Sequence, residues 1–214
     1  NLTVKNPIIN DKILGYKNHF KNRKLMIAQY VNNVEHWEKW QLEYKYGLIL
    51  IMPTEPIFSI VNELRTKYDF RSQSYCDAHI SLSLPIPRPL TEVDWEELVK
   101  IASSIKPFEI HYGKLKDFPP YPGVVFSIEP QTKIDTVRKK IEKASIFKNA
   151  IPRRFPYKAH MTIAEFISVE DTKEILNELE NKTPTGSFLC ENLVYIVPDD
   201  KMHFEVIRQL KLGN

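Results

Sequence analysis

The sequence predicts an α+β fold with antiparallel sheets, and an internal duplication is the main reason. The segment Ala-His-Ile-Ser-Leu at residues 78–82 recurs as Ala-His-Met-Thr-Ile at 159–163. Each copy alternates polar and aliphatic residues with the period of two that a β-strand imposes on its two faces. One such pattern is weak, but two of them require a common explanation.

The duplication extends beyond these two copies. Gly47 and Gly123 each open an apolar stretch and lie 76 residues apart, while His79 and His160 lie 81 residues apart. These similar offsets predict a repeated unit of strand, helix, motif strand, helix and strand. Two such units that face each other would bring the two histidines together across a cleft.

The remaining elements follow from apolar periodicity and from helix-capping residues. Besides the motif strands, we expect strands at 45–52, 107–115, 122–129, 187–197 and 202–212. We expect helices at 54–68, 91–105, 132–146 and 168–180, the last three opening on the capping boxes Thr91/Asp94, Thr132/Asp135 and Ser168/Asp171. Strands interrupted by helices, with several hairpins, favour this α+β arrangement over a doubly wound parallel sheet.

Composition bounds the class of protein. The chain has 214 residues, of which 43% are hydrophobic and 27% charged, as in an ordinary soluble globular protein of one domain or two small lobes. No apolar run approaches the length of a membrane helix, so no membrane partner is expected. Cys76 and Cys190 form no disulfide framework or zinc pattern, which favours a reducing compartment and predicts a cytoplasmic location.

The N-terminal part is the most basic. Residues 1–46 carry eight Lys/Arg against four Asp/Glu, whereas the whole chain has a net charge of only +3, so a general nucleic-acid coat is not favoured. We expect an irregular arm at 1–17 and a long amphipathic helix at 18–44, followed by the duplicated domain at 45–214. This helix would pack on the body of the protein, or its basic residues would contact a nucleic-acid backbone.

The two motifs suit acid–base chemistry better than metal binding. Neither motif places a carboxylate beside its histidine, and a zinc site normally has three or four protein ligands, so no metal or cofactor is expected. Near neutral pH one imidazole can be neutral and accept a proton while the other is protonated and donates one. Ser81 and Thr162 would donate hydrogen bonds to phosphate oxygens. Cationic side chains precede the second histidine and would add positive charge: Arg153, Arg154 and Lys158.

The paired His-Ile-Ser-Leu and His-Met-Thr-Ile sequences resemble the His-x-[Ser/Thr]-hydrophobic motifs of the 2H phosphoesterase superfamily, in particular its RNA-ligase-like, cyclic phosphodiesterase branch. The resemblance covers about residues 45–212. It implies a bilobal fold of two pseudo-symmetric lobes, each with an antiparallel sheet and outer helices, and an active-site cleft between them. It also implies metal-independent hydrolysis of 2′,3′-cyclic or 2′-5′ phosphodiesters on RNA ends or nucleotides. His79 and His160 would then be the acid and base, and Ser81 and Thr162 the phosphate ligands.

A second interpretation remains open, in which the cleft binds RNA or a nucleotide without turning it over. It rests on Glu165, which stands shortly after the second motif where family members often carry a basic residue, on the basic approach at 153–158 and on the added N-terminal helix. In either case bases would stack on Phe118 or Tyr121 of the proline-rich loop, unless these two aromatics only pack. We expect a monomer whose partner is a nucleotide or an RNA terminus.

Overall fold

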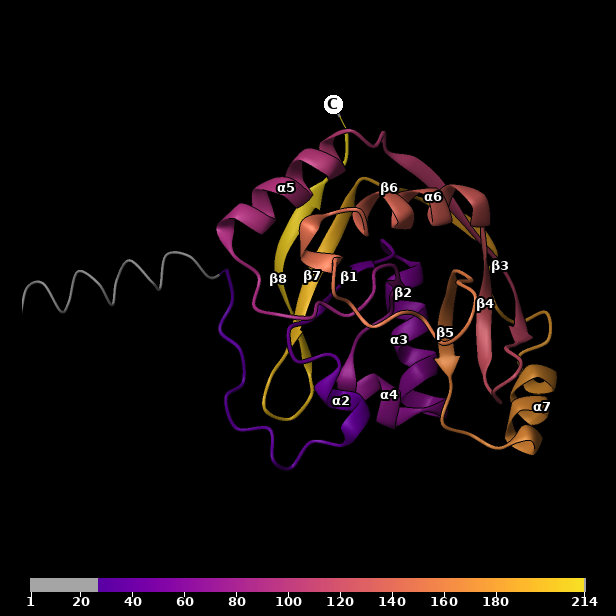
Figure 1. Ribbon diagram of the computed structural model, residues 1–214. Coiled ribbons are helices and arrows are strands. Elements are labelled where there is room, and N and C mark those ends of the chain that lie inside the picture. The colour runs from indigo at the N-terminus through magenta and orange to yellow at the C-terminus, as the bar shows by residue number, and fades with distance from the viewer. Residues whose placement is uncertain (1–26, 214) are drawn as a thin grey trace, which may run out of the picture.

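The computed structural model describes residues 27–213 of the chain, so the predicted arm and the first part of the predicted N-terminal helix lie outside the described residues (Figure 1). The strands are β1 Leu48–Ile51, β2 Ile80–Ser81, β3 Phe108–Asp117, β4 Val124–Glu129, β5 His160–Ala164, β6 Gly186–Cys190, β7 Asn192–Pro198 and β8 Phe204–Lys211. The helices are α2 Lys39–Leu42, α3 Ile57–Tyr68, α4 Phe70–Tyr75, α5 Glu92–Ser103, α6 Gln131–Ile141 and α7 Val169–Glu178, with a 3-10 turn at Ser145–Phe147.

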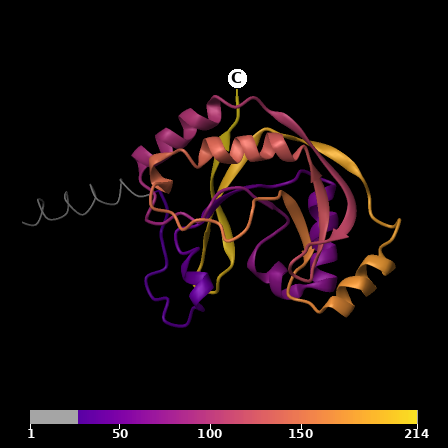
Figure 2. The same ribbon diagram turned by 45° about the vertical axis from the view of Figure 1, so that its right-hand side comes forward.

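The strands form two four-stranded sheets, each entirely antiparallel. The order is β2-β1-β7-β8 in one sheet and β5-β4-β3-β6 in the other. Each motif strand therefore lies at the edge of its own sheet, beside the strand that precedes it in its repeat. The two sheets stand side by side in Figures 1 and 2, which confirms the predicted α+β, two-lobed arrangement.

The sheets do not coincide with the two repeats. The third strands of the repeats, β3 and β6, pair with each other in the second sheet, with Phe108 opposite Cys190. The first sheet is completed instead by the C-terminal hairpin of β7 and β8. Because of this exchange, the two sheets share one continuous buried apolar cluster.

The helices cover the sheets in a way that keeps the two motif strands close. In Figure 1, α5 and α6 lie across the top, where α5 packs on β8 and α6 packs on β4. Helix α7 packs on β3 and β4. Helix α3, which follows β1 of the first sheet, packs against β5 of the second, and the edge strands β2 and β5 contact each other. The junction between the sheets is therefore where the two motifs meet.

The predicted N-terminal helix is wrong for the part that the structure describes. Of residues 27–44, only Lys39–Leu42 are helical. The rest is held in an irregular path by contacts to distant parts of the fold: the Ile27 amide donates to the Leu90 carbonyl at 3.2 Å, and Trp37 Nε1 donates to the Asp200 carbonyl at 3.2 Å. Tertiary contacts of this kind override the helical periodicity of the local sequence.

Two of the three predicted capping boxes are confirmed. Thr91 and Asp94 cap α5, and Ser168 and Asp171 cap α7. The third prediction is wrong, because α6 begins directly after Pro130, one residue before Thr132.

The carboxylate expected in that third cap is used elsewhere. Asp135 pairs with Arg138 and Lys139, its neighbours on the same helix. The polar segment before the first motif contains the short helix α4, whose N-cap is Asp69. Among the described residues, no helix is long and apolar enough to cross a membrane.

Candidate active site

A cavity of about 340 Å³ lies at the junction of the two sheets, within the size range of small-molecule sites. All four motif side chains line it: His79, Ser81, His160 and Thr162. The cleft expected from the duplication is therefore present, and both copies of the motif contribute to it.

Strand alternation explains why these side chains face the cavity. Ile80 lies between His79 and Ser81 in the first motif, while Met161 lies between His160 and Thr162 in the second. Both aliphatic side chains are fully buried in the shared core. Because neighbouring residues of a strand point to opposite faces, burying them turns each histidine and each hydroxyl toward the cavity.

The first motif strand is much shorter than predicted. Only Ile80 and Ser81 are in strand conformation, because the amides of Leu82 and Ser83 both donate to the Ile49 carbonyl, at 3.2 and 3.0 Å. Ser83 Oγ accepts the Ile49 amide at 2.9 Å and donates to the Leu84 carbonyl at 2.7 Å. The hydroxyl of Ser83, which shares the face of His79 by alternation, is therefore structural.

The two imidazoles are oriented by the same device. Nδ1 of His79 lies 2.6 Å from the Asp77 carbonyl, and Nδ1 of His160 lies 2.8 Å from the Lys158 carbonyl. A carbonyl oxygen only accepts, so each Nδ1 carries the hydrogen and donates it. In the neutral ring Nε2 then carries the lone pair. Each histidine thus keeps Nε2 for a ligand, in the tautomer that can accept a proton there.

Both imidazoles favour their neutral form. Burial lowers the pKa of His79 to about 4, with smaller contributions from the Arg65 cation and from His160. Burial also lowers the pKa of His160, and the cations of Lys116 and Lys158 act in the same direction. A bound anion would oppose these effects, because a nearby negative charge favours the imidazolium form.

The two hydroxyl-bearing residues are fixed through their backbones. The Tyr157 hydroxyl donates to the Ser81 carbonyl at 3.0 Å, and Arg65 Nη1 donates to the Thr162 carbonyl at 3.1 Å. Within residues 27–213 neither side-chain hydroxyl makes a hydrogen bond. The two hydroxyls are thereby positioned by the fold and remain free to donate to a ligand.

Arg65 is a residue of this site that the motifs of the sequence do not indicate. It extends from α3 into the cavity wall, is only 2% exposed, and donates to the carbonyls of Ser72 and Cys76 at 2.8 and 2.9 Å in addition to that of Thr162. Burial lowers the pKa of Arg65, but a guanidinium remains charged in proteins. It therefore joins α3 and α4 to the second motif and places a positive charge beside the cavity.

The position of Arg65 on its helix could have indicated from the sequence that this residue is functional. Ile57, Val61 and Arg65 are spaced by four residues and form the buried stripe of α3. A cation at a core position of an amphipathic helix is costly unless paired, so it marks a site that needs the charge.

Glu165 also lines the cavity, with Ser72 and Asp69 behind it. Ser72 Oγ lies 3.1 Å from Glu165 Oε1 and 2.6 Å from Asp69 Oδ2, and the Glu165 amide donates to Asp69 at 2.9 Å. Burial raises the pKa of Glu165, with the Arg65 cation acting in the opposite direction. The residue that departs from the usual family pattern is thus held in place in the cavity wall.

The cysteines are unreactive packing residues. Both are free and buried, and burial raises the pKa of Cys76 and of Cys190 to about 12. Cys76 packs with Leu48, Leu50 and Ile196 in a small apolar cluster that lines the cavity. This part of the cavity wall is therefore apolar, while its motif edge is polar.

The basic residues before the second motif do not line the cavity. Arg153 donates to the Leu82 carbonyl at 2.6 Å and pairs with Glu142 at 2.7 Å, which braces the end of the first motif. Arg154 pairs with Glu43 at 2.9 Å. Lys158 lies 5.9 Å from the centre of the Phe118 ring.

The two predicted stacking aromatics have different surroundings. The Phe118 ring lies 4.1 Å from the His160 ring, at an interplanar angle of 34°. Tyr121 is 61% exposed and packs edge-to-face on Phe155. Phe118 therefore supports a motif histidine, whereas Tyr121 lies at the surface.

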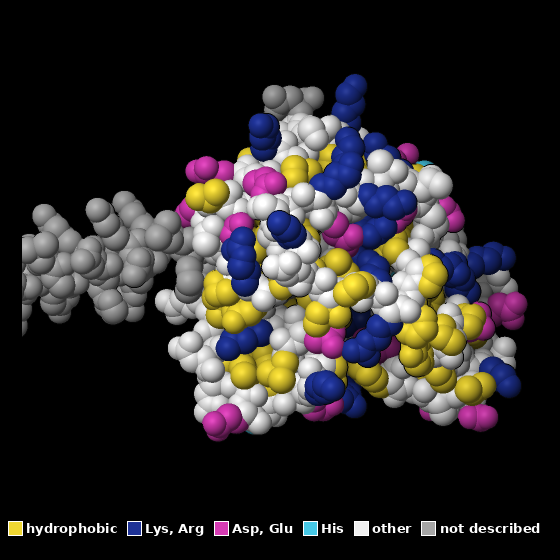
Figure 3. All heavy atoms as spheres, viewed as in Figure 1, with side chains coloured by type: hydrophobic (Ala, Val, Ile, Leu, Met, Phe, Trp, Pro, Cys, Tyr) yellow, Lys and Arg dark blue, Asp and Glu magenta, His cyan; other side chains and the backbone are white. Residues whose placement is uncertain are grey.

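Lysine and arginine side chains gather on the face of the molecule that Figure 3 shows. They form a band running from the top of the molecule, where α6 lies, toward the middle of this face. The last turn of α6 carries Arg138, Lys139 and Lys140. The charge of +3 is therefore unevenly distributed over the surface.

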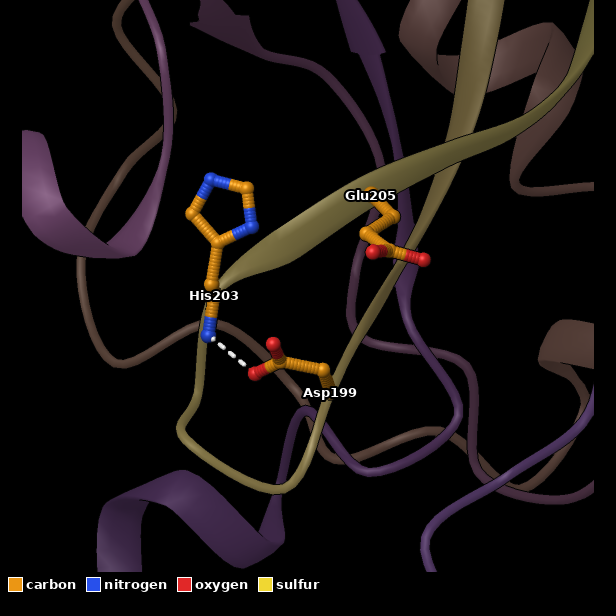
Figure 4. Close-up of side chains that lie close together, drawn as sticks. All are labelled: Asp199, His203 and Glu205. Carbon is orange, nitrogen blue, oxygen red and sulfur yellow. Dashed lines mark hydrogen bonds between the residues drawn. The ribbon is translucent and has the colours of Figure 1, made fainter.

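One group of potential metal ligands occurs in the described part of the chain, at the turn between β7 and β8. Asp199, His203 and Glu205 lie near one another there, but all are at least partly exposed. Asp199 accepts the amides of Lys201 and His203, and Figure 4 shows the bond from the His203 amide. Asp199 is thus engaged in shaping the turn.

The fold and the cavity together define a two-motif, two-lobed protein, and comparison with known proteins agrees. The family described as the 2′-5′ RNA ligase superfamily matches residues 53–201, and the chain belongs to it. This confirms the resemblance drawn from the paired motifs.

Two relatives from Bacillus are similar in sequence. A protein of Bacillus cytotoxicus, named as a candidate phosphoesterase, is 28% identical over 137 residues, which cover 63% of this chain and 77% of the relative. A similarly named protein of Bacillus thuringiensis strain Al Hakam is 26% identical over 168 residues, or 77% of this chain and 89% of the relative.

Two solved structures share the fold. TT0787 of Thermus thermophilus superimposes with a TM-score of 0.52 at 16% identity and covers 78% of this chain and 98% of its own. LigT of Escherichia coli, in its complex with 3′-AMP, gives a TM-score of 0.53 at 11% identity and covers 78% and 97%.

Proposed function

We propose that this protein is a metal-independent phosphodiesterase that hydrolyses 2′,3′-cyclic or 2′-5′ phosphodiester bonds of RNA ends or small nucleotides. The observation that carries the proposal is the cavity at the sheet junction, lined by His79, Ser81, His160 and Thr162. Both histidines donate Nδ1–H to a backbone carbonyl, which keeps Nε2 available for proton transfer. Membership of the 2′-5′ RNA ligase superfamily supports the reaction class.

For a cyclic phosphate the proton transfers balance with two imidazoles. The neutral ring takes a proton from water as the water oxygen bonds to phosphorus. The bond from phosphorus to the ribose 2′ or 3′ oxygen breaks, and the protonated ring gives its proton to that oxygen. The product is a phosphomonoester, and exchange with solvent returns both rings to their starting states.

The hydroxyls and Arg65 stabilise the charge that develops on phosphate. Ser81 and Thr162 donate to the non-bridging oxygens, and a donor already held in position loses little reorganisation energy during the reaction. Arg65 adds a fixed positive charge in the cavity wall. This charge replaces the basic residue that family members often carry shortly after the second motif.

The anion also resolves an apparent conflict with the low histidine pKa values. In the free protein both rings are mainly neutral, yet the reaction needs one imidazolium. A bound phosphodiester brings a negative charge beside both rings and raises the pKa of the one that faces the leaving oxygen. The substrate thereby assists in protonating its own acid.

Nucleotide substrates are favoured by the structural relatives as well. The solved complexes of LigT include 3′-AMP and NADP⁺ as ligands of that protein. Those folds match this one only at low identity, so it is the cavity of this chain that carries the proposal. The polar motif edge fits a phosphate, and the remainder of the cavity has room for the attached nucleoside.

The experiment is an assay with purified protein in the presence of a chelator. A nucleoside 2′,3′-cyclic phosphate and a 2′-5′ dinucleotide are offered in parallel, and we expect turnover of at least one. His79→Ala and His160→Ala should each lower it severely. Absence of turnover over a panel of both linkages, together with saturable nucleotide binding, would favour the binding-module alternative, for which Glu165 in the cavity is the motivating observation.

A further inference from the structure

The cavity has a second, aromatic wall that the proposed chemistry does not use. Trp40, Tyr44 and Tyr75 all line the cavity. This wall is aromatic, whereas the edge formed by the two motifs is polar. The Trp40 ring centre lies 5.8 Å from that of Tyr75 and 6.3 Å from that of Tyr44. Phe204 extends the same wall, 6.1 Å from Tyr44.

Two of these rings come from the N-terminal segment. Trp40 belongs to α2, and Tyr44 follows that helix closely, so both lie outside residues 53–201 that match the family. The matched region alone would leave this side of the cavity open. Residues added before the family domain therefore complete the cavity.

The N-terminal segment contacts two other parts of the chain at this place. Glu38 Oε2 accepts Trp40 Nε1 at 2.8 Å, which fixes the indole, and Glu38 also approaches Arg71 of α4 at 3.6 Å. Glu43 pairs with Arg154 of the segment that leads into the second motif, at 2.9 Å. Together with the hydrogen bonds of Ile27 and Trp37 to remote carbonyls, these contacts place the two rings at the cavity wall.

The aromatic rings pack edge-to-face, with interplanar angles of 64° for Trp40 with Tyr75 and 74° for Trp40 with Tyr44. Trp40, Tyr44 and Tyr75 are each only half-buried. Half-buried rings at a cavity wall can cover the face of a planar ligand. Desolvation raises the pKa of Tyr44, and the nearby carboxylates of Glu43 and Glu165 raise it further, so its hydroxyl is a stable hydrogen-bond donor beside the rings.

We infer that this wall, centred on Trp40, is a stacking site for the base of a nucleotide whose phosphate lies between the two histidines. The inference rests on the proposed function and narrows it, because it requires a substrate with a planar heteroaromatic ring. A base has apolar faces that stack on aromatic side chains and a polar edge that reaches groups such as Tyr44 and Glu165. A cyclic phosphate without a base would leave the wall empty.

The test compares two substrates that differ only in the base. Nucleoside 2′,3′-cyclic phosphate and ribose 2′,3′-cyclic phosphate present the same reacting ring. We expect the wild-type protein to prefer the nucleotide by about 10- to 100-fold in kcat/KM, the range that one stacked base contributes. Trp40→Leu should remove most of this preference, mainly by raising KM for the nucleotide, and leave the ribose substrate unaffected. Trp40→Phe should retain part of it.

Binding gives a readout that needs no turnover. Of the three tryptophans, only Trp40 lines the cavity. Adding a nucleoside 3′-monophosphate should quench its fluorescence, whereas inorganic phosphate should not. The quenching should be absent in Trp40→Phe and present in the matched control Trp95→Phe, because Trp95 lies on α5 and does not line the cavity.

The outcomes separate the two proposals. Turnover of both substrates at equal kcat/KM, or an unchanged preference in Trp40→Leu, would overturn the stacking site while leaving the phosphodiesterase intact. If neither substrate is turned over, the proposed function fails, and the fluorescence decides the stacking site alone. Equal quenching in wild type and Trp40→Phe would then refute it.

Discussion

The two motif strands carry similar residues but differ in their surroundings. Strand β5 is a five-residue strand paired along β4, whereas β2 is reduced to two residues and its end is braced by Ser83 and Arg153. The histidines nevertheless share one arrangement, with Nδ1 donating to the carbonyl two residues before the ring. The duplication has kept the orientation of the rings, although the strands that carry them have diverged.

The electrostatic environments of the two rings differ more than their geometry. His79 lies near the buried Arg65 guanidinium, and its pKa is lowered to about 4. His160 packs against the Phe118 ring, and the cations of Lys116 and Lys158 lie nearby. Burial lowers the pKa of both rings, but the neighbouring cations differ, Arg65 for His79 and two lysines for His160. A pKa of about 4 keeps His79 neutral near neutral pH, which favours His79 as the base and His160 as the acid in the proposed mechanism.

Removing either ring should have the largest effect. His79→Ala and His160→Ala are each expected to lower kcat/KM by about 10²–10⁴-fold, because each deletes one positioned proton-transfer group. The double variant should lose far less than the product of the two single losses, since the groups act as a unit. His111→Ala, an exposed histidine of β3, is the matched control and should keep full activity. Full activity in either single motif variant would contradict a two-histidine reaction.

The two hydroxyls should come next in size. Thr162→Val keeps the shape of the side chain but deletes its donor, and Ser81→Ala does the same for the first motif. We expect each to lower kcat by about 10²–10³-fold, as for the loss of one preorganised donor to a developing oxyanion. Thr162→Ser and Ser81→Thr, which retain the hydroxyl, should stay within a few-fold of wild type. Steady-state kinetics on a cyclic nucleotide measures all four.

Arg65 interacts differently with the two motif strands. It donates a hydrogen bond to the Thr162 carbonyl of β5, and its positive charge lowers the pKa of His79 beside β2. Arg65→Met should lower the free energy of unfolding by about 3 kcal/mol, since buried carbonyls lose their donor. The pKa of His79 should rise, because the neighbouring cation that lowers it has gone. Denaturant unfolding and an NMR titration of the imidazole check both points. Arg71→Met, on the adjacent α4 and exposed, is the control and should change stability little. An unchanged His79 pKa in Arg65→Met would contradict the claim that the Arg65 cation lowers it.

The smallest expected effect is the pH dependence of kcat and kcat/KM, which reports the different surroundings of the two histidines. The reaction needs the ring of lower pKa neutral and the other protonated, so kcat/KM should be greatest between the two free-protein values. The pKa of His79 is lowered to about 4 and that of His160 is also lowered from its ordinary value, which places the optimum on the acidic side of neutrality. Bound phosphate raises the pKa of the acid, so the optimum of kcat should lie at higher pH than that of kcat/KM. Coincident optima above pH 6.5 would show that burial does not govern these rings.

Much of the site could be predicted from the sequence because strand alternation is local. Once Ile80 and Met161 are taken as core residues, the faces of their neighbours follow. The helix caps at Thr91 and Ser168 are equally local, and they too are confirmed. The duplication then supplied the long-range step, since two equivalent motif strands were expected to meet.

The rest depended on contacts between distant segments. The N-terminal periodicity suggested a helix, but hydrogen bonds from Ile27 and Trp37 to remote carbonyls hold most of that segment in a non-helical path. The positions of Trp40 and Tyr44 in the cavity follow from that path and could not be read from their spacing. Arg65 was detectable as a cation on a buried helical stripe, although its partners could not be named without the packing of α3 on β5.

The most direct measurement is a crystal structure of the protein with a bound nucleoside 3′-monophosphate, the kind of product that hydrolysis of a cyclic phosphate leaves. We expect Nε2 of His79 and Nε2 of His160 both to lie within hydrogen-bond distance of the same phosphate, with the hydroxyls of Ser81 and Thr162 on its other oxygens. A phosphate that touches only one of the two histidines, or that binds outside the cavity, would contradict the two-histidine mechanism.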